Sequence, residues 1–161
     1  MDRGICRETM GKLLADEGAR LRELARLLEQ EHELLLANDV VRLESAIRER
    51  QSCVGAIIRI DEERRSLCRL SGYGNDAKGL EQLLRWCDPQ GTLTSRWADV
   101  AQLAGRCREF NDRNGALVSA RLKRVQTLLG VLIGGGREGV TYGRGGGYAL
   151  GTVGRVVATE A

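Results

Sequence analysis

Apolar residues in the first part of the chain recur at steps of three, four and seven. This spacing places them on one face of a helix that runs from about Cys6 to Leu36. The positions are Met10, Leu13, Leu14, Leu21, Leu24, Leu27, Leu28, Leu34 and Leu35. The pattern stops at the letters ANDV, where Asn38 or Asp39 can accept a hydrogen bond from the free N–H groups of a new helix. We therefore predict that a second helix follows almost at once.

This second helix is expected to begin near Val40 and to carry an apolar stripe of its own. The stripe consists of Val40, Leu43, Ile47, Val54, Ile57, Ile58, Leu67 and Cys68. It stops at the letters SGYGND, where Gly72 and Gly74 remove the steric cost of left-handed backbone. Because the link between the two long helices is so short, we predict that they lie antiparallel.

A short third helix is predicted for the letters AKGLEQLLRWC, residues 77–87. Asn75 or Asp76 can cap its first turn. Its buried side is expected to consist of Leu80, Leu83, Leu84 and Cys87. The letters DPQG that follow predict a turn, in which Pro89 fixes φ and Gly91 supplies permissive backbone.

A fourth helix is expected to begin near Thr92 or Thr94, and it contains the letters NDRNG at residues 111–115. The stripe of this fourth helix that is expected to face the other helices consists of Trp97, Val100, Ala104, Cys107, Asn111, Asn114, Val118, Leu122, Val125, Leu129 and Leu132. Its steps are three or four on both sides of the polar letters, whereas a hairpin turn would normally reset the phase. We predict one continuous helix, with Asn111 and Asn114 on its inward side. These amides either fix the register of the packed helices or contact a partner directly.

The end of this fourth helix holds more aliphatic residues than one packed stripe needs. They are Leu117, Val118, Leu122, Val125, Leu128, Leu129, Val131, Leu132 and Ile133. Only one stripe can pack on the first two helices, so Leu117, Leu128 and Val131 in particular stay exposed unless something covers them. Exposed apolar surface of this kind marks partner sites, commonly for an amphipathic helix. The alternative is a core wide enough to bury every one of these side chains.

Beyond Ile133 the sequence becomes glycine-rich and loses its helical spacing. We predict a helical domain of residues 1–133 and a flexible tail of residues 134–161. The fold expected is all-α: an antiparallel bundle of three long helices plus one short helix, with a flexible Gly-rich C-terminal tail. The glycines are not expected to bind nucleotide, because no G-K-[ST] follows them and no strand precedes them.

Composition agrees with a single aliphatic helical domain, since the chain has 161 residues, 4% aromatic residues and one proline. The 25 basic and 22 acidic side chains alternate along the helices, which predicts a solvated surface and no nucleic-acid site. No stretch approaches the roughly 20 apolar residues of a membrane span, and the first residues carry charges where a signal peptide needs an apolar run. We expect a cytoplasmic protein without membrane insertion.

Candidate catalytic or metal-binding chemistry is sparse. Five cysteines form no C-x-x-C pair and His32 is the single histidine, so we predict buried reduced thiols, no metal and no cofactor. The carboxylates alternate with arginines, as in the letters DEERR at residues 61–65, and we expect them to be solvated. No catalytic site is predicted, and the chain is not expected to be an enzyme.

The order of these motifs resembles the FlgN family over nearly the whole chain. The resemblance is carried by EHELLLANDVVRLE, EERRSLCRLSGYG, RWADVAQLAGRCREFNDRNGALVSARL and TYGRGGG. In that family a Trp opens the last helix, a Cys or similar small residue precedes Asn-x-x-Asn-Gly, and Tyr-Gly follows a leucine-rich stretch. Those places are taken by Trp97, Cys107, Asn111, Asn114, Gly115, Tyr142 and Gly143.

The resemblance implies a cytoplasmic chaperone of the flagellar hook-filament junction proteins FlgK and FlgL. Such a chaperone holds their C-terminal helical segments, prevents premature association and brings them to the type III export gate. It also implies that an exposed tyrosine docks on the gate protein FlhA, with Tyr142 the first candidate and Tyr148 the second. The alternative for each tyrosine is that it folds back onto the bundle. A different interpretation is a coiled-coil adaptor without chaperone activity, whose fourth helix forms a homodimer.

Overall fold

The computed structural model describes residues 2–135 and divides into two compact units, Met1–Ser119 and Ala120–Ala161. All of the secondary structure in the described residues is helical, which confirms the all-α prediction. The predicted tail lies almost entirely outside the described residues, so the boundary near residue 133 stays a prediction. Within residues 2–135, none of the helices combines the length and the apolar character that crossing a membrane requires.

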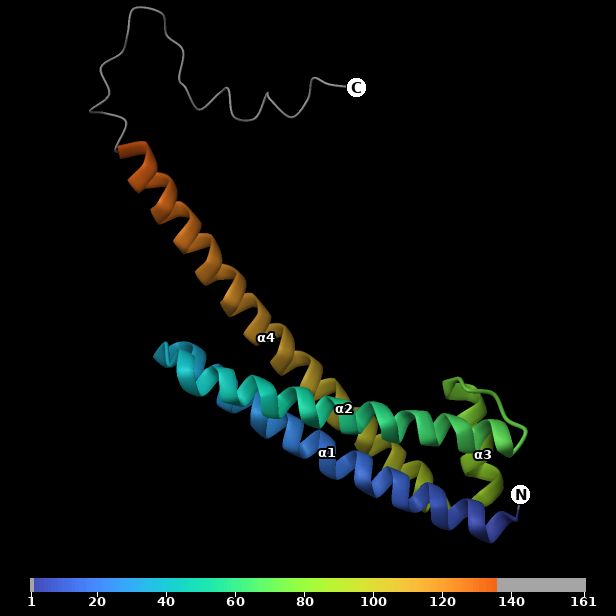
Figure 1. The fold of residues 1–161 in the computed structure, drawn as a ribbon. Coiled ribbons are helices and arrows are strands. Elements are labelled where there is room, and N and C mark those ends of the chain that lie inside the picture. Colours follow the sequence, from blue (N-terminus) through green and yellow to red (C-terminus); the bar gives the residue numbers. More distant parts are fainter. Residues whose placement is uncertain (1, 136–161) are drawn as a thin grey trace, which may run out of the picture. The chain divides into compact units, whose positions relative to one another are not determined.

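Four helices make up the described chain, three long and one short, as predicted (Figure 1). They are α1 (Arg3–Ala37), α2 (Val40–Leu70), α3 (Ala77–Cys87) and α4 (Thr92–Gly135). The first unit contains α1, α2, α3 and α4 as far as Ser119.

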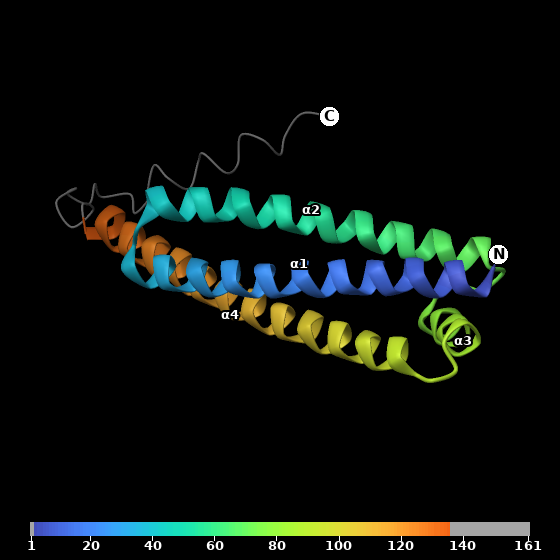
Figure 2. The same ribbon diagram turned by 90° about the horizontal axis from the view of Figure 1, so that it is seen from below.

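The hairpin between α1 and α2 is closed by two adjacent polar residues. Asn38 has a φ of 56°, and this left-handed backbone ends α1. Asp39 begins α2, because its side chain accepts a hydrogen bond from the Arg42 backbone N–H at 3.1 Å. The two helices therefore lie side by side and antiparallel, as predicted (Figure 2).

The loop before α3 folds tightly against the first turn of that helix. Asp76, rather than Asn75, is the cap, and its side chain accepts a hydrogen bond from the Gly79 N–H at 2.7 Å. Gly72 has the predicted positive φ of 81°, but Gly74 does not, so the prediction is wrong there. Gly79 is the glycine that permits the close approach here, since a Cβ on it would lie 2.2 Å from the Gly74 carbonyl oxygen.

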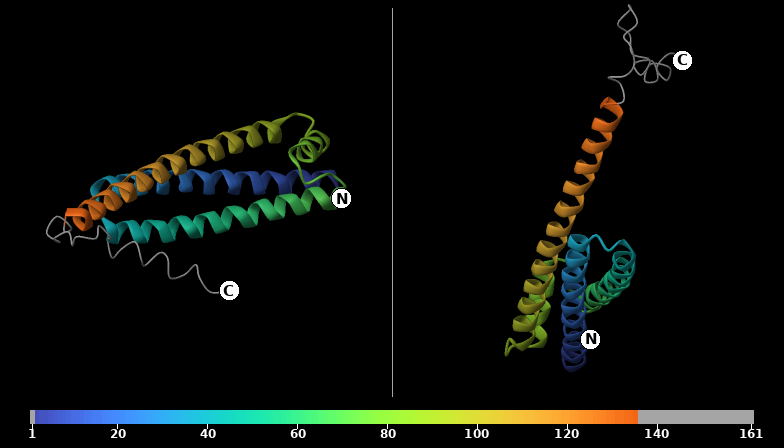
Figure 3. Two further views of the ribbon diagram at one scale, coloured as in Figure 1. Left: turned by 90° about the horizontal axis from the view of Figure 1, so that it is seen from above. Right: turned by 90° about the vertical axis from the view of Figure 1, so that its left-hand side faces the viewer.

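The short helix α3 lies across the end of the hairpin at which α1 begins and α2 ends (Figure 3). Its predicted apolar side is buried throughout: Leu80, Leu83, Leu84 and Cys87 are at most 2% exposed. The turn that follows has Gly91 at a φ of 79°, as predicted. Asp88, which is 1% exposed, accepts a hydrogen bond from the Leu93 N–H at 2.7 Å and thereby stabilises the first turn of α4.

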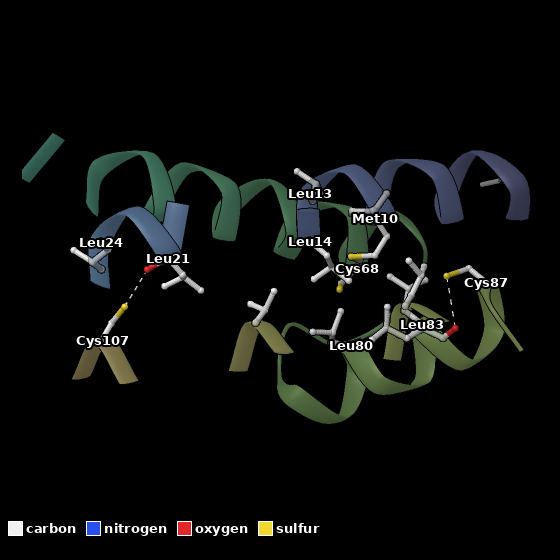
Figure 4. Close-up of a cluster of buried hydrophobic side chains, with 14 of the residues drawn as sticks. Met10, Leu13, Leu14, Leu21, Leu24, Cys68, Leu80, Leu83, Cys87 and Cys107 are labelled. Carbon is white, nitrogen blue, oxygen red and sulfur yellow. Dashed lines mark hydrogen bonds between the residues drawn. The ribbon is translucent and has the colours of Figure 1, made fainter. Parts of the chain in front are cut away.

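The core of the first unit uses every seventh residue of each long helix. These residues are Leu14, Leu21, Leu28 and Leu35 of α1, Ala46, Cys53, Ile60 and Leu67 of α2, and Leu93, Val100, Cys107 and Asn114 of α4. In Figure 4, Cys107 points at Leu21, whose carbonyl oxygen accepts from the Cys107 thiol at 3.3 Å. A seven-residue repeat is typical of helices that pack as in coiled coils.

Two ion pairs, each with a buried glutamate of α1, fix the register of α1 against α2. Arg64 Nε lies 3.4 Å from Glu17, and Arg50 Nε donates to Glu31 at 2.7 Å. The Arg64 guanidinium also lies 4.6 Å from the centre of the Trp97 ring, so this arginine connects α1, α2 and α4. The expectation of a fully solvated 61–65 stretch is wrong for Arg64, whose side chain is only 12% exposed because Glu17 draws it inward.

Candidate functional site

The letters NDRNG, residues 111–115, lie within α4, which continues without interruption from Thr92 to Gly135. Asp112, Arg113 and Gly115 are exposed, so no polar side chain at these positions has to be buried in the helix packing. The predicted continuity of the fourth helix is thus confirmed.

Asn114 is buried, with 5% of its surface exposed, and both ends of its amide are hydrogen-bonded to α1. Its Nδ2 donates to the Leu28 carbonyl oxygen at 2.8 Å, and its Oδ1 lies 2.9 Å from His32 Nδ1. Because a carbonyl oxygen only accepts, the Leu28 bond sets the orientation of the amide. Oδ1 is therefore an acceptor, and His32 Nδ1 carries the donated proton. This arrangement supports the first role predicted for Asn114, fixing the register of packed helices.

Asn111 is exposed, so its predicted inward position is wrong. Its place is taken by Phe110, which packs against the core, while the guanidinium groups of Arg106 and Arg113 lie 5.8 and 5.0 Å from the centre of its ring. The sequence stripe assumed steps of four and three from Cys107. The packed helix instead steps by three and then four, from Cys107 through Phe110 to Asn114, because both orders preserve the seven-residue repeat.

The aliphatic residues beyond Asn114 are not used by the core. Leu117 is half-buried, whereas Val118, Leu122, Val125, Leu128, Leu129, Val131, Leu132 and Ile133 are 49–72% exposed. The alternative of a core wide enough to bury all of them is therefore wrong, and so is the inward position predicted for the stripe beyond Asn114. One reason is the repeat itself, which leads from Asn114 to Arg121 and not to Leu122.

Most of these exposed side chains share one side of the second unit's helical segment. At 100° per residue, Leu122, Val125, Leu128, Leu129, Leu132 and Ile133 cover an arc of about 140°. We call this set the α4 aliphatic face. Leu128 forms one edge of the arc, Leu122 and Ile133 form the other, and Val131 lies outside it beyond Leu128.

A second surface feature is a groove between α1 and the beginning of α4. It has a volume of about 600 Å³ and is lined by Gly4, Arg7, Glu8, Gly11, Lys12, Ala15, Thr92, Leu93 and Arg96. Lys12 is paired with Glu8 at 2.7 Å, and Arg7 lies 3.4 Å from the buried Asp88. Arg7, Glu8 and Lys12 in this groove are thus each paired within the first unit.

The five cysteines are all free and buried, as predicted from their spacing. Burial raises the pKa of Cys107, and burial together with the neighbouring Cys6 thiol raises the pKa of Cys87 to about 11. Thiols with raised pKa values are poor nucleophiles at neutral pH, so their role here is packing. Among the described residues, no group of three or more potential ligand side chains is placed to hold a metal ion.

Two features, one on α1 and one on α4, do not follow from the sequence reasoning above. His32 was considered only as a metal ligand, although its spacing on α1 places it four residues beyond Leu28, on the side that meets Asn114. The cations Arg121, Lys123 and Arg124 beside the aliphatic face were also overlooked, and their signal is a stretch of sequence without any acidic residue.

Comparison with known proteins gives one match. A family model described as FlgN protein matches residues 7–149, which includes α1 to α4 in full apart from the first four residues of α1. No match was found among curated proteins or among solved structures. Tyr142 and Tyr148, the tyrosines predicted to dock at an export gate, lie outside the described residues.

Proposed function

Because the chain belongs to the FlgN family of flagellar export chaperones, we propose that it binds the C-terminal helical segments of the hook-filament junction proteins FlgK and FlgL. Binding in the cytoplasm keeps these segments from associating prematurely, and the chaperone then delivers them to the export gate. FlgN is a family of chaperones and not of enzymes, so the relevant chemistry is the covering and release of apolar surface.

The observation that carries this proposal is the exposure of the α4 aliphatic face. Leu132 is 72% exposed and Leu128 is 55% exposed, on a helix that needs neither side chain for its core. An amphipathic helix from a client buries its own apolar stripe on such a face, which removes the surface through which clients would self-associate. Each aliphatic side chain that becomes fully covered contributes about 1.5–3 kcal/mol.

Asn114 contributes to the stability of the first unit by holding its part of α4 in register with α1. Its two hydrogen bonds are the last buried polar contacts along α4 before the exposed aliphatic residues begin. We assign to Asn114 a role in the helix register of the first unit and to the exposed Asn111 a place on the client-accessible surface.

Delivery requires contact with the gate, and we propose FlhA as the gate protein that the chaperone meets. The candidates for this contact are Tyr142 and, second, Tyr148, on the basis of their place after the leucine-rich stretch. A tyrosine combines a large apolar ring with a hydroxyl group, which suits it to a shallow pocket. Replacing Tyr142 with Ala is expected to reduce FlhA binding and motility; unchanged values for both would remove Tyr142 from the gate contact.

The decisive test is co-purification of the full chain with the C-terminal segments of FlgK and FlgL. We expect Leu128→Asp and Leu132→Asp each to weaken the complex by tenfold or more, about 1.4 kcal/mol, because a carboxylate would be buried without a partner. Ile58→Asp is the matched control, since Ile58 is 53% exposed on α2. Absence of a complex with the unmodified chain contradicts the proposal, as does equal loss in the control.

The coiled-coil adaptor interpretation predicts a different result. It requires a stable homodimer through α4 that gains no mass when FlgK or FlgL segments are added. Light scattering over a concentration series separates the two, because a chaperone is expected to remain monomeric until the client is present.

A further inference from the structure

The helical segment that carries the α4 aliphatic face has charges of only one sign. Arg121, Lys123 and Arg124 lie on it, and the sequence contains no acidic residue between Asp112 and Glu138. This stretch is unusual in a chain whose 25 basic residues are otherwise interleaved with 22 acidic residues. The surface around the aliphatic face is therefore cationic.

Several cations in the first unit have an acidic partner on their own helix. Lys12 pairs with Glu8 at 2.7 Å, Arg26 pairs with Glu23 at 2.7 Å, and Arg85 pairs with Glu81 at 2.6 Å, all within single helices. Among the described residues, no ion pair involves Lys123 or Arg124. A helix built only for solubility would carry both signs, as α1 and α3 do.

The cations are not distributed evenly around the helix. Arg124 and Arg121 precede Leu128 by four and seven residues, so both lie on the same edge of the face as Leu128. Lys123 lies on the far side of the helix. The edge formed by Leu122 and Ile133 adjoins the neutral Gln126 and Gly130. The face thus has one cationic edge and one neutral edge.

We propose that the occupant of the α4 aliphatic face is an amphipathic helix whose aliphatic stripe is bordered by Asp or Glu on the side that meets Arg121 and Arg124. This inference rests on the proposed chaperone function and specifies the chemistry of the client segment. Opposite charges at the rim of an interface accelerate encounter and fix orientation, while the aliphatic contact supplies most of the affinity.

A second copy of this chain does not have that chemistry. Its own α4 segment brings three more cations and no carboxylate, so a homodimer through this face gains no ion pair and suffers mutual repulsion. The same charges that attract an acidic client therefore oppose self-association of the empty chaperone.

The test uses the full chain and two synthetic helical peptides with the same aliphatic stripe. One peptide has Glu along one border of the stripe and the other has Lys at the same positions. We expect the Glu peptide to bind at least tenfold more tightly at low salt, with the difference shrinking as added salt shortens the Debye length to about 3 Å at 1 M. Equal affinity for the two peptides, or binding of neither, overturns the inference.

Matched variants localise the effect on the helix. Arg124→Glu is expected to weaken binding of the Glu peptide about three- to tenfold. Lys123→Glu makes the same change in net charge on the far side of the helix. It is expected to change the logarithm of the affinity by less than half as much. Equal effects from the two variants overturn the assignment to the Leu128 edge. Circular dichroism of each variant checks that the helix content is unchanged.

The outcome for FlgK and FlgL segments keeps this inference separate from the proposed function. If those segments bind with an affinity that neither salt nor Arg124→Glu alters, the chaperone function stands and the charge inference fails. If the Glu peptide binds as described but neither segment binds, the charge inference stands and the assignment of FlgK and FlgL fails.

Discussion

The two parts of α4 carry similar aliphatic spacing and use it differently. In the first part Leu93 and Val100 are each 3% exposed and pack against the glycines Gly11 and Gly18 of α1. In the second part Leu129 is 51% exposed, although it follows the same steps of three and four. Spacing therefore predicts that a helix has an apolar face. Whether that face is buried depends on whether another helix has residues that pack against it.

Charge follows the same division. In the first unit Arg64 and Arg50 reach buried carboxylates, so cations help to hold the helices in register. Along the second unit's segment the cations have no acidic neighbours in sequence. On the proposed function this face binds a client, and the like charges beside it would oppose association between two copies of the chain without covering the surface.

The largest expected effect comes from truncating the same residue type in the two parts of α4. Leu93→Ala is expected to lower the free energy of unfolding by about 2–5 kcal/mol, because it leaves a cavity against α1. Leu129→Ala is expected to change it by less than about 0.5 kcal/mol, since the side chain is already in solvent. Urea unfolding followed by circular dichroism measures both. Comparable losses would mean that the second part of α4 is also core.

A smaller effect is expected from the two asparagines. Asn114→Ala should lower the free energy of unfolding by about 1–3 kcal/mol, because the Leu28 carbonyl oxygen and His32 each lose a partner. Asn111→Ala, at an exposed position three residues away, is expected to be neutral within about 0.5 kcal/mol. The same urea experiment compares them, and equal losses would contradict the assignment of Asn114 alone to the helix register.

Sequence spacing was sufficient for most of the helices because long aliphatic repeats and capping residues are local signals. The helix of residues 77–87 and its cap near Asp76 could be predicted for that reason. The inward position of Phe110 could not be predicted in this way, because steps of three then four and steps of four then three give the same seven-residue repeat. Choosing between them requires knowing where Leu28 and His32 stand on α1.

Buried charges escaped prediction for a different reason. Arg64 belongs to a run of charged letters that reads as solvated, and only the arrangement of α1 and α4 around it brings Glu17 and Trp97 within reach. Asp88 likewise reads as part of a turn until the Leu93 N–H in the first turn of α4 is placed over its carboxylate. The exposed aliphatic face was predictable in outline, because its excess of side chains is visible without any partner helix.

The smallest expected effect contrasts a buried charge of the bundle with an exposed one. Burial is the main cause that raises the pKa of Glu17, whereas the hydrogen bond from Lys12 lowers the pKa of the exposed Glu8. A raised carboxyl pKa contributes stability below its unfolded value and loses it as pH rises through the folded value. Relative to Glu17→Gln, the unmodified chain should therefore lose stability as pH rises from below the ordinary glutamate pKa, near 4.5, to neutral.

Glu8 gives the opposite sign in the same experiment. Because its pKa is lowered, its contribution is present above the unfolded value and is lost as pH falls. Relative to Glu8→Gln, the unmodified chain should gain stability as pH rises through the lowered pKa toward the ordinary glutamate value near 4.5, just below the interval in which it loses stability relative to Glu17→Gln. Urea unfolding at a series of pH values measures both differences. Slopes of the same sign would mean that the Arg64 pair outweighs the burial of Glu17, and that the bundle buries this charge without a net cost.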